Sequence, residues 1–88
     1  MKFQRAASTA IEIDLIGKRE AEAKRDLERF IDSALLSGVP FVRIVHGKGE
    51  GILRKMVYDL LRKHPEVRSI EDAIAPDGGG RATGVHFD

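Results

Sequence analysis

The chain has 88 residues, a formal net charge of +1 and no cysteine. This length predicts one small domain, and the lack of cysteine excludes both a disulfide framework and a thiolate zinc site. No apolar run approaches the roughly 20 residues of a membrane span, and the first ten residues lack the apolar stretch of a signal peptide, so we expect a cytoplasmic domain with no membrane partner.

The first predicted element is a strand over Ile11 to Ile16, where apolar and polar residues alternate. Residues 1–9 show no such pattern, and we expect a flexible leader or linker remnant there, with the domain itself spanning residues 10–88. Apolar residues at three- and four-residue steps then predict an amphipathic helix from Arg19 to Ser37, closed by Gly38.

The second half of the chain repeats the order of strand and helix. A β-branched run predicts a strand from Phe41 to Val45, and helical spacing predicts a second helix from Ile52 to just before Pro65. Segments 66–75 and 82–87 predict two more strands around a glycine-rich turn. The fold class is therefore α/β, an α+β two-layer sandwich of order β-α-β-α-β-β. A right-handed crossover and an alternating first strand place both helices on one face of a four-stranded mixed sheet.

Glycine takes every second position in the stretch from His46 to Gly51, directly after the second predicted strand. If the first two strands are parallel neighbours, their ends share one rim, and Asp14 lies near His46. Glycines let a backbone approach a ligand closely, and successive N–H groups that open onto a helix N-terminus bind anions. Lys48 adds a positive charge, so this rim predicts a phosphate site.

The phosphate is not expected to be that of a nucleotide cofactor. No Gly-Lys-Ser/Thr follows the loop, and Ile52 stands where the dinucleotide fingerprint requires glycine. Basic residues outnumber acidic ones between Phe41 and Arg68, which is compatible with a polyanion. A phosphodiester backbone lying across the rim fits these observations better.

The stretch VRIVHGKGEGILRKMVYDLLRKHPEV, with IDLIG before the first helix, resembles the Smr (small MutS-related) domain. In particular it resembles the form at the C-terminus of a bacterial MutS paralogue distinct from the mismatch-recognition protein. The likeness runs from about Ile11 to Phe87. It implies a fold related to the C-terminal domain of translation initiation factor three, with sheet order 1-2-4-3 and the last strand antiparallel.

The resemblance also implies a function, a DNA-nicking endonuclease within a larger DNA repair or recombination-control protein. The expected partner is duplex or branched DNA. The alternatives are an RNA endonuclease acting in ribosome quality control, and a nucleic-acid or ribosome-binding module that does not cleave. We expect the parent protein to be a dimer and the isolated domain a monomer.

His46 and Asp14 are the expected catalytic residues. His46 is the candidate acid or base, because imidazole titrates near neutrality. Asp14 could orient His46, act as a base or hold a divalent cation, although a lone aspartate predicts no metal site and no other cofactor is expected. The candidate nucleic-acid-binding residues are Gly47, Lys48, Gly49, Gly51, Lys18, Arg19 and Arg54.

The sequence departs from the family pattern at Ile16. The family motif Leu-Asp-Leu-His/Arg-Gly here reads IDLIG, so an apolar residue replaces the basic one, which favours the module that does not cleave. Each site residue also has a structural alternative. His46 could hydrogen-bond a carbonyl at the strand end, Asp14 could face the dipole of the first helix, and Ile16 could pack under the glycine loop.

Overall fold

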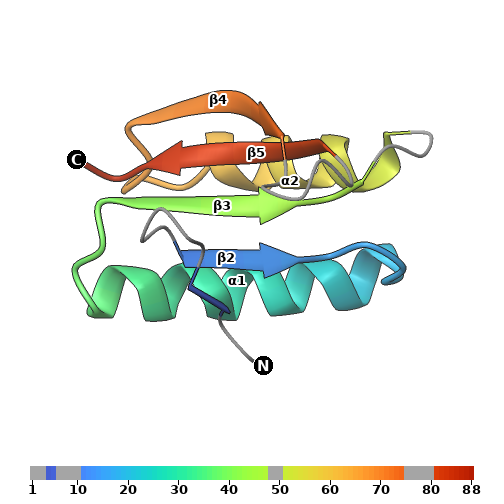
Figure 1. Cartoon of the computed structure of the whole chain (residues 1–88), viewed down its shortest axis with the longest axis horizontal. Coiled ribbons are helices and arrows are strands. Elements are labelled where there is room, and N and C mark those ends of the chain that lie inside the picture. The colour runs from blue at the N-terminus through green and yellow to red at the C-terminus, as the bar shows by residue number, and fades with distance from the viewer. Residues whose placement is uncertain (1–3, 6–10, 48–50, 75–80) are drawn as a thin grey trace.

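A mixed β-sheet carries two helices on one of its faces, with the other face uncovered by helices (Figure 1). The computed structural model describes residues 4–5, 11–47, 51–74 and 81–88. In chain order the elements are β1 (Gln4–Arg5), β2 (Ile11–Asp14), α1 (Glu20–Leu36), β3 (Phe41–Val45), α2 (Ile52–Arg62), β4 (Ser69–Ile74) and β5 (Arg81–His86).

The sheet order is β1-β2-β3-β5-β4, which confirms the predicted order of the four main strands. β2 and β3 are parallel, and β5 runs antiparallel to both β3 and β4. One strand was not predicted. Gln4 and Arg5, in the segment expected to be a flexible leader, pair antiparallel with Glu12 and Ile11. A pairing of two residues is too short to produce a periodic pattern in the sequence.

The core lies between the sheet and the helices. The residues that α1 and α2 bury recur at helical spacing, and they are Ala23, Leu27, Phe30, Ile31, Ala34, Met56, Val57 and Leu61. The strands add alternate residues from the helix-covered face, among them Ile13, Val42, Ile44 and Val85. Neither helix in the described part of the chain is long and apolar enough to cross a membrane.

Two predicted strand boundaries differ from the structure by two residues or more. β2 ends at Asp14 rather than Ile16 because a turn begins there, with Gly17 at φ 84° and the Lys18 amide donating to the Leu15 carbonyl at 3.1 Å. β4 begins at Ser69 rather than at residue 66. The predicted glycine-rich turn falls mainly on residues 75–80, which lie outside the described residues.

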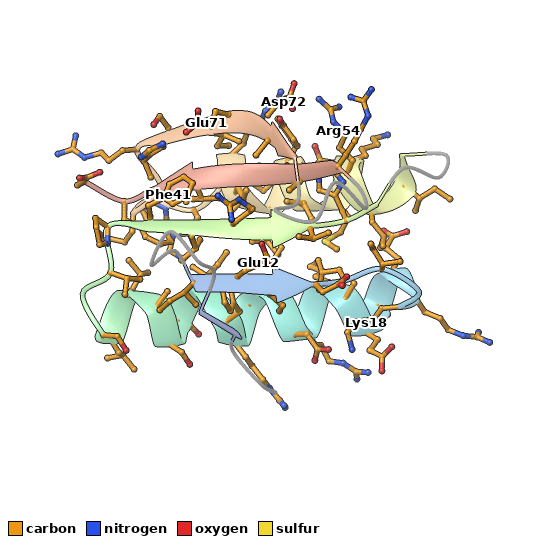
Figure 2. All side chains as sticks on the ribbon, in the orientation of Figure 1. Glu12, Lys18, Phe41, Arg54, Glu71 and Asp72 are labelled. Atoms are coloured by element: carbon orange, nitrogen blue, oxygen red, sulfur yellow. The ribbon has the colours of Figure 1, made fainter. Side chains whose placement is uncertain are left out.

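The uncovered face of the sheet is partly apolar. Phe41, Glu12 and Glu71 lie on it in Figure 2, and the Glu12 carboxylate pairs with Arg43 at 3.4 Å. Val45 is buried on the same face against Ala82. This face therefore holds charged pairs and a small apolar cluster.

Candidate nucleic-acid interface

The carboxyl ends of β2 and β3 form one rim of the sheet, and both helices begin there (Figure 1). Asp14 is the register partner of Val45, and the Leu15 amide donates to the Val45 carbonyl at 2.8 Å. The rim was predicted from the parallel pairing. In open α/β sheets, ligands bind outside the carboxyl ends of the strands.

The two helix N-termini at this rim differ in charge. α1 carries Glu20 and Glu22 in its first turn, whereas α2 has no acidic residue there and includes Arg54. α2 starts after Gly51, which has a φ of 84° that only glycine adopts without strain. The first N–H groups of a helix have no partner within the helix, and they carry partial positive charge. The N-terminus of α2 is therefore the better place for an anion.

His46 lies at the end of β3 and is only 6% exposed. Its Nε2 is 2.9 Å from the Thr83 hydroxyl, and its Nδ1 is 3.3 Å from the Gly47 carbonyl oxygen. Because a carbonyl only accepts, the Gly47 contact is a hydrogen bond only in the tautomer that carries its proton on Nδ1. Burial lowers the pKa of His46, so the ring is neutral at neutral pH.

Three residues near His46 were not among the predicted site residues, and they are Thr83, its register partner Asp72 on β4, and Tyr58 on α2. Tyr58 donates from its hydroxyl to Asp72 Oδ1 at 2.7 Å. The Arg54 guanidinium lies 4.6 Å from the centroid of the Tyr58 ring and 3.3 Å from the same Asp72 oxygen. The hydrogen bond from Tyr58, followed by that from Arg54, lowers the pKa of Asp72.

Asp14 and His46 lie on opposite faces of the sheet. Asp14 shares the uncovered face with its partner Val45, whereas His46 meets Thr83, a fully buried residue on the helix-covered face. Asp14 Oδ1 accepts a hydrogen bond from the Ile16 amide at 2.8 Å, which stabilises the turn after β2. The structure thus gives His46 a different partner from the Asp14 carboxylate considered from sequence.

Ile16 packs against the start of the glycine loop although it is 51% exposed. A methyl group added at Gly47, whose φ is 77°, would stand 3.1 Å from Cγ1 of Ile16. Glycine at this position therefore serves both the backbone angle and the close approach of Ile16. This contact is the structural alternative that the sequence left open for Ile16.

The expected binding residues are only partly free. Lys18 Nζ pairs with Asp26 at 3.0 Å, and this hydrogen bond raises the pKa of Lys18 and lowers that of Asp26. Arg19 precedes α1 and is exposed, with no side-chain partner among the described residues. Lys48 and Gly49 lie outside the described residues. In the described part of the chain no three His, Asp or Glu side chains come together as a metal site.

The fold and the rim together define a class of protein, the small two-layer α/β domain with a glycine-bounded helix N-terminus beside a histidine. A family model described as Smr domain matches residues 13–88, and the chain belongs to this family.

Curated relatives support the assignment. The chain is 52% identical over 68 residues to "Endonuclease MutS2" of Halalkalibacterium halodurans, a match that covers 77% of this chain and 9% of that protein. It is 48% identical over 75 residues to "Endonuclease MutS2" of Levilactobacillus brevis, a match that covers 85% of this chain and 10% of that protein. The chain thus spans about a tenth of the length of these relatives.

Solved structures agree with the fold. The crystal structure of the Smr domain of Thermus thermophilus MutS2 superimposes with a TM-score of 0.78 at 35% identity, covering 88% of this chain and 96% of that one. YdaL of Escherichia coli, a stand-alone small MutS-related protein, gives a TM-score of 0.79 at 28% identity, and the match covers 86% of this chain and 63% of YdaL.

Proposed function

We propose that this Smr domain binds DNA and nicks it, hydrolysing a phosphodiester at the rim formed by Asp14 and the loop of residues 46–51, within a larger DNA repair or recombination-control protein. The observation that carries the proposal is the N-terminus of α2, which begins after Gly51 at the same rim as the end of β3 and has no acidic residue in its first turn. The relatives named as MutS2 endonucleases support the same activity.

In this proposal the phosphate lies on the first N–H groups of α2, and Arg54 and the loop lysine Lys48 add positive charge. A phosphodiester is held there by fixed dipoles, which stabilise the charge that develops on its oxygens during hydrolysis. DNA binding of this kind is steeply salt-dependent because neutralised phosphates release counterions. Duplex or branched DNA is the proposed partner.

His46 is the proposed acid or base, acting through Nδ1. Thr83 holds Nε2 at 2.9 Å, whereas the contact from Nδ1 to the Gly47 carbonyl is long, at 3.3 Å. A substrate oxygen can replace that carbonyl more easily than it can replace the Thr83 hydroxyl. Burial favours the neutral ring, and in the tautomer that carries its proton on Nε2 the Nδ1 lone pair is free to take a proton from the attacking water.

Asp14 acts separately in this proposal, since it lies on the opposite face and caps its own turn. Its carboxylate is 2.8 Å from the Ile16 amide and fixes the backbone on which Ile16 meets Gly47. If Asp14 and the substrate phosphate together bound a divalent cation, that cation would act as a Lewis acid on the phosphate from the uncovered face of the sheet. Stimulation of nicking by Mg²⁺, lost in Asp14→Asn, tests that part of the proposal.

The direct test is nicking of supercoiled plasmid by the isolated domain. His46→Ala should lower the initial rate by about 10² or more, because general acid–base catalysis typically contributes 10²–10⁴. His64→Ala is the matched control, since that histidine lies beyond the C-terminal end of α2 and should leave the rate unchanged. Equal rates for wild type and His46→Ala would overturn the proposed role.

A second candidate function is a nucleic-acid-binding module that does not cleave. The observation that favours it is Ile16, which places an apolar side chain against Gly47 where the family motif carries His or Arg. In that case the domain binds duplex DNA with a steep salt dependence but does not nick it. Parallel assays with supercoiled DNA and a structured RNA separate this module from the proposed DNA endonuclease and from an RNA endonuclease.

A further inference from the structure

One side of α2 carries Arg54, Tyr58 and Arg62 at four-residue steps, which align along a helix. The guanidinium carbon of Arg54 lies 4.6 Å from the centroid of the Tyr58 ring, and that of Arg62 lies 5.8 Å from the same centroid. Both lie within the separation of about 6 Å at which a cation is attracted to an aromatic face. One ring therefore holds two cations in a row that starts in the first turn of α2.

Asp72 of β4 fixes this row against the sheet (Figure 2). Its Oδ1 accepts from the Tyr58 hydroxyl at 2.7 Å and from the Arg54 guanidinium at 3.3 Å. The carboxylate offsets one positive charge, but the Arg54 side chain stays 45% exposed. A guanidinium has five N–H donors, so Arg54 can bind a phosphate without leaving Asp72.

The two sides of α2 differ in charge. The side opposite the row lines a groove of about 560 Å³ against α1. The charged residues that line this groove are Glu20, Glu28, Asp32, Asp59, Lys24 and Lys63. Four carboxylates against two lysines make the groove unfavourable for a polyanion. A DNA backbone that meets the N-terminus of α2 is therefore directed to the side of the two arginines.

We propose that Arg54, Tyr58 and Arg62, here called the arginine row, bind the phosphate backbone of duplex DNA and carry it from the N-terminus of α2 along the helix. This inference rests on the DNA binding in the proposed function and not on cleavage. Arg54 and Arg62 are eight residues apart, which is about 12 Å along a helix. Nucleotides of one strand follow each other at about 3.4 Å along the duplex axis, so the row spans about three to four of them.

The arginine row is suited to a backbone rather than to unpaired bases. Proteins hold single strands by stacking bases on aromatic rings, whereas the Tyr58 ring already has two guanidinium groups over it. Arginine presents planar donors that match the oxygens of a phosphate, and stacking on an aromatic ring keeps that plane in place. Binding to the row is therefore independent of base sequence and favours duplex over single-stranded DNA.

The test compares two adjacent positions at the end of α2. Arg62→Gln and Lys63→Gln each remove one positive charge, but Lys63 lies on the groove side and serves as the matched control. Fluorescence anisotropy with a duplex of mixed sequence, in EDTA so that no metal-dependent cleavage occurs, gives affinities at several salt concentrations. Denaturation midpoints of both variants verify that they are folded. Tyr58→Leu removes the ring, and Tyr58→Phe keeps it.

We expect Arg62→Gln to lower the slope of log affinity against log salt by about 0.9, the loss of one phosphate contact, and Lys63→Gln to leave the slope unchanged. Tyr58→Leu should weaken binding about twofold to fivefold, the worth of an exposed cation–π contact, and Tyr58→Phe should recover it.

Equal slopes for Arg62→Gln and Lys63→Gln would overturn the arginine row, and tighter binding of a single strand than of a duplex would overturn its proposed occupant. If the wild-type domain shows the expected slopes but does not nick, the row stands and the cleavage in the proposed function falls. Absence of salt-dependent DNA binding by the wild-type domain overturns both.

Discussion

Two corners of the rim each connect a parallel strand to a helix but differ in chemistry. They are the β2–α1 corner, residues 14–20, and the β3–α2 corner, residues 46–54, of which the structure describes 46–47 and 51–54. The first has a left-handed glycine at Gly17, and the second has two, Gly47 and Gly51. At the β2–α1 corner Lys18 pairs with Asp26 of α1. At the β3–α2 corner a buried histidine faces a hydroxyl.

This difference shows that a glycine before a helix does not by itself make an anion site. The β2–α1 corner already has carboxylates on Glu20 and Glu22 in the first turn of its helix, and these satisfy the positive end of the dipole. The first turn of α2 has none, and Arg54 extends beside it (Figure 2). A phosphate is therefore expected at the β3–α2 corner. The β2–α1 corner contributes the side chain of Ile16, which packs against Gly47.

The largest expected effect comes from giving the β2–α1 corner the cation that it lacks. Ile16→Arg should raise the nicking rate, on the order of 10²-fold if a charge there stabilises the scissile phosphate as one such contact commonly does. The long stem of arginine can cover the apolar surface that Ile16 now covers. Initial rates on supercoiled DNA at fixed salt measure the gain, with Ile16→Gln as a neutral control. No gain over that control would exclude position 16 from the chemistry.

Glycine substitutions compare the two corners directly. Gly17→Ala and Gly47→Ala both force alanine into a left-handed conformation, at a cost of roughly 1–2 kcal/mol. Only at Gly47 does the new methyl group also meet Ile16, at 3.1 Å, so its loss of unfolding free energy should be larger by about 1 kcal/mol. Chemical denaturation gives the values. The double variant Gly47→Ala with Ile16→Ala should remove the additional loss of unfolding free energy seen at Gly47. Equal losses at both glycines would show that the Ile16 side chain moves aside at no cost.

Two cation substitutions separate the corners in DNA binding. Arg54→Gln should weaken binding and reduce the slope of log affinity against log salt by about 0.9, the loss of one phosphate contact. Lys18→Gln should change both far less, because its ammonium group lies at the β2–α1 corner, beside the acidic first turn of α1. Fluorescence anisotropy with a duplex at several salt concentrations measures both slopes. A larger change for Lys18→Gln would place the DNA on the β2–α1 corner.

The smallest expected effect is a pH dependence of stability. Burial places the folded-state pKa of His46 below its ordinary value of 6.5, so the unfolded chain binds the proton more readily. The contribution of neutral His46 to the unfolding free energy is therefore complete above pH 6.5 and is lost as the pH falls through the lower folded-state pKa. Denaturation midpoints between pH 8 and 5 should decline less steeply in His46→Gln than in wild type. Parallel curves would contradict the burial effect.

Most of the fold was predictable from the sequence because periodicity carried it. The alternation around Ile13 and the helical steps around Leu27 and Met56 placed the strands, the helices and the shared rim correctly. The two-residue β1 gave no such signal, and its pairing with β2 depends on contacts distant in sequence.

The site was predictable in outline and not in its contacts. Counting by two from the buried Val42 and Ile44 places His46 on the helix-covered face, whereas Asp14 falls on the other, so their separation could have been deduced. The contact of Thr83 with His46 could not have been deduced, because it depends on the pairing of β3 with β5. The contact of Tyr58 with Asp72 likewise depends on where β4 lies in the sheet.

The central claim is that the phosphodiester lies at the β3–α2 corner, and amide chemical shifts test it most directly. A short DNA duplex is titrated into the nitrogen-15-labelled domain at low salt and again at high salt. The largest shifts are expected for the amides of Gly47 and of residues 51–54, fading as salt is raised. Shifts that are largest in residues 17–22, or on the uncovered sheet face around Phe41 and Glu71, would contradict it.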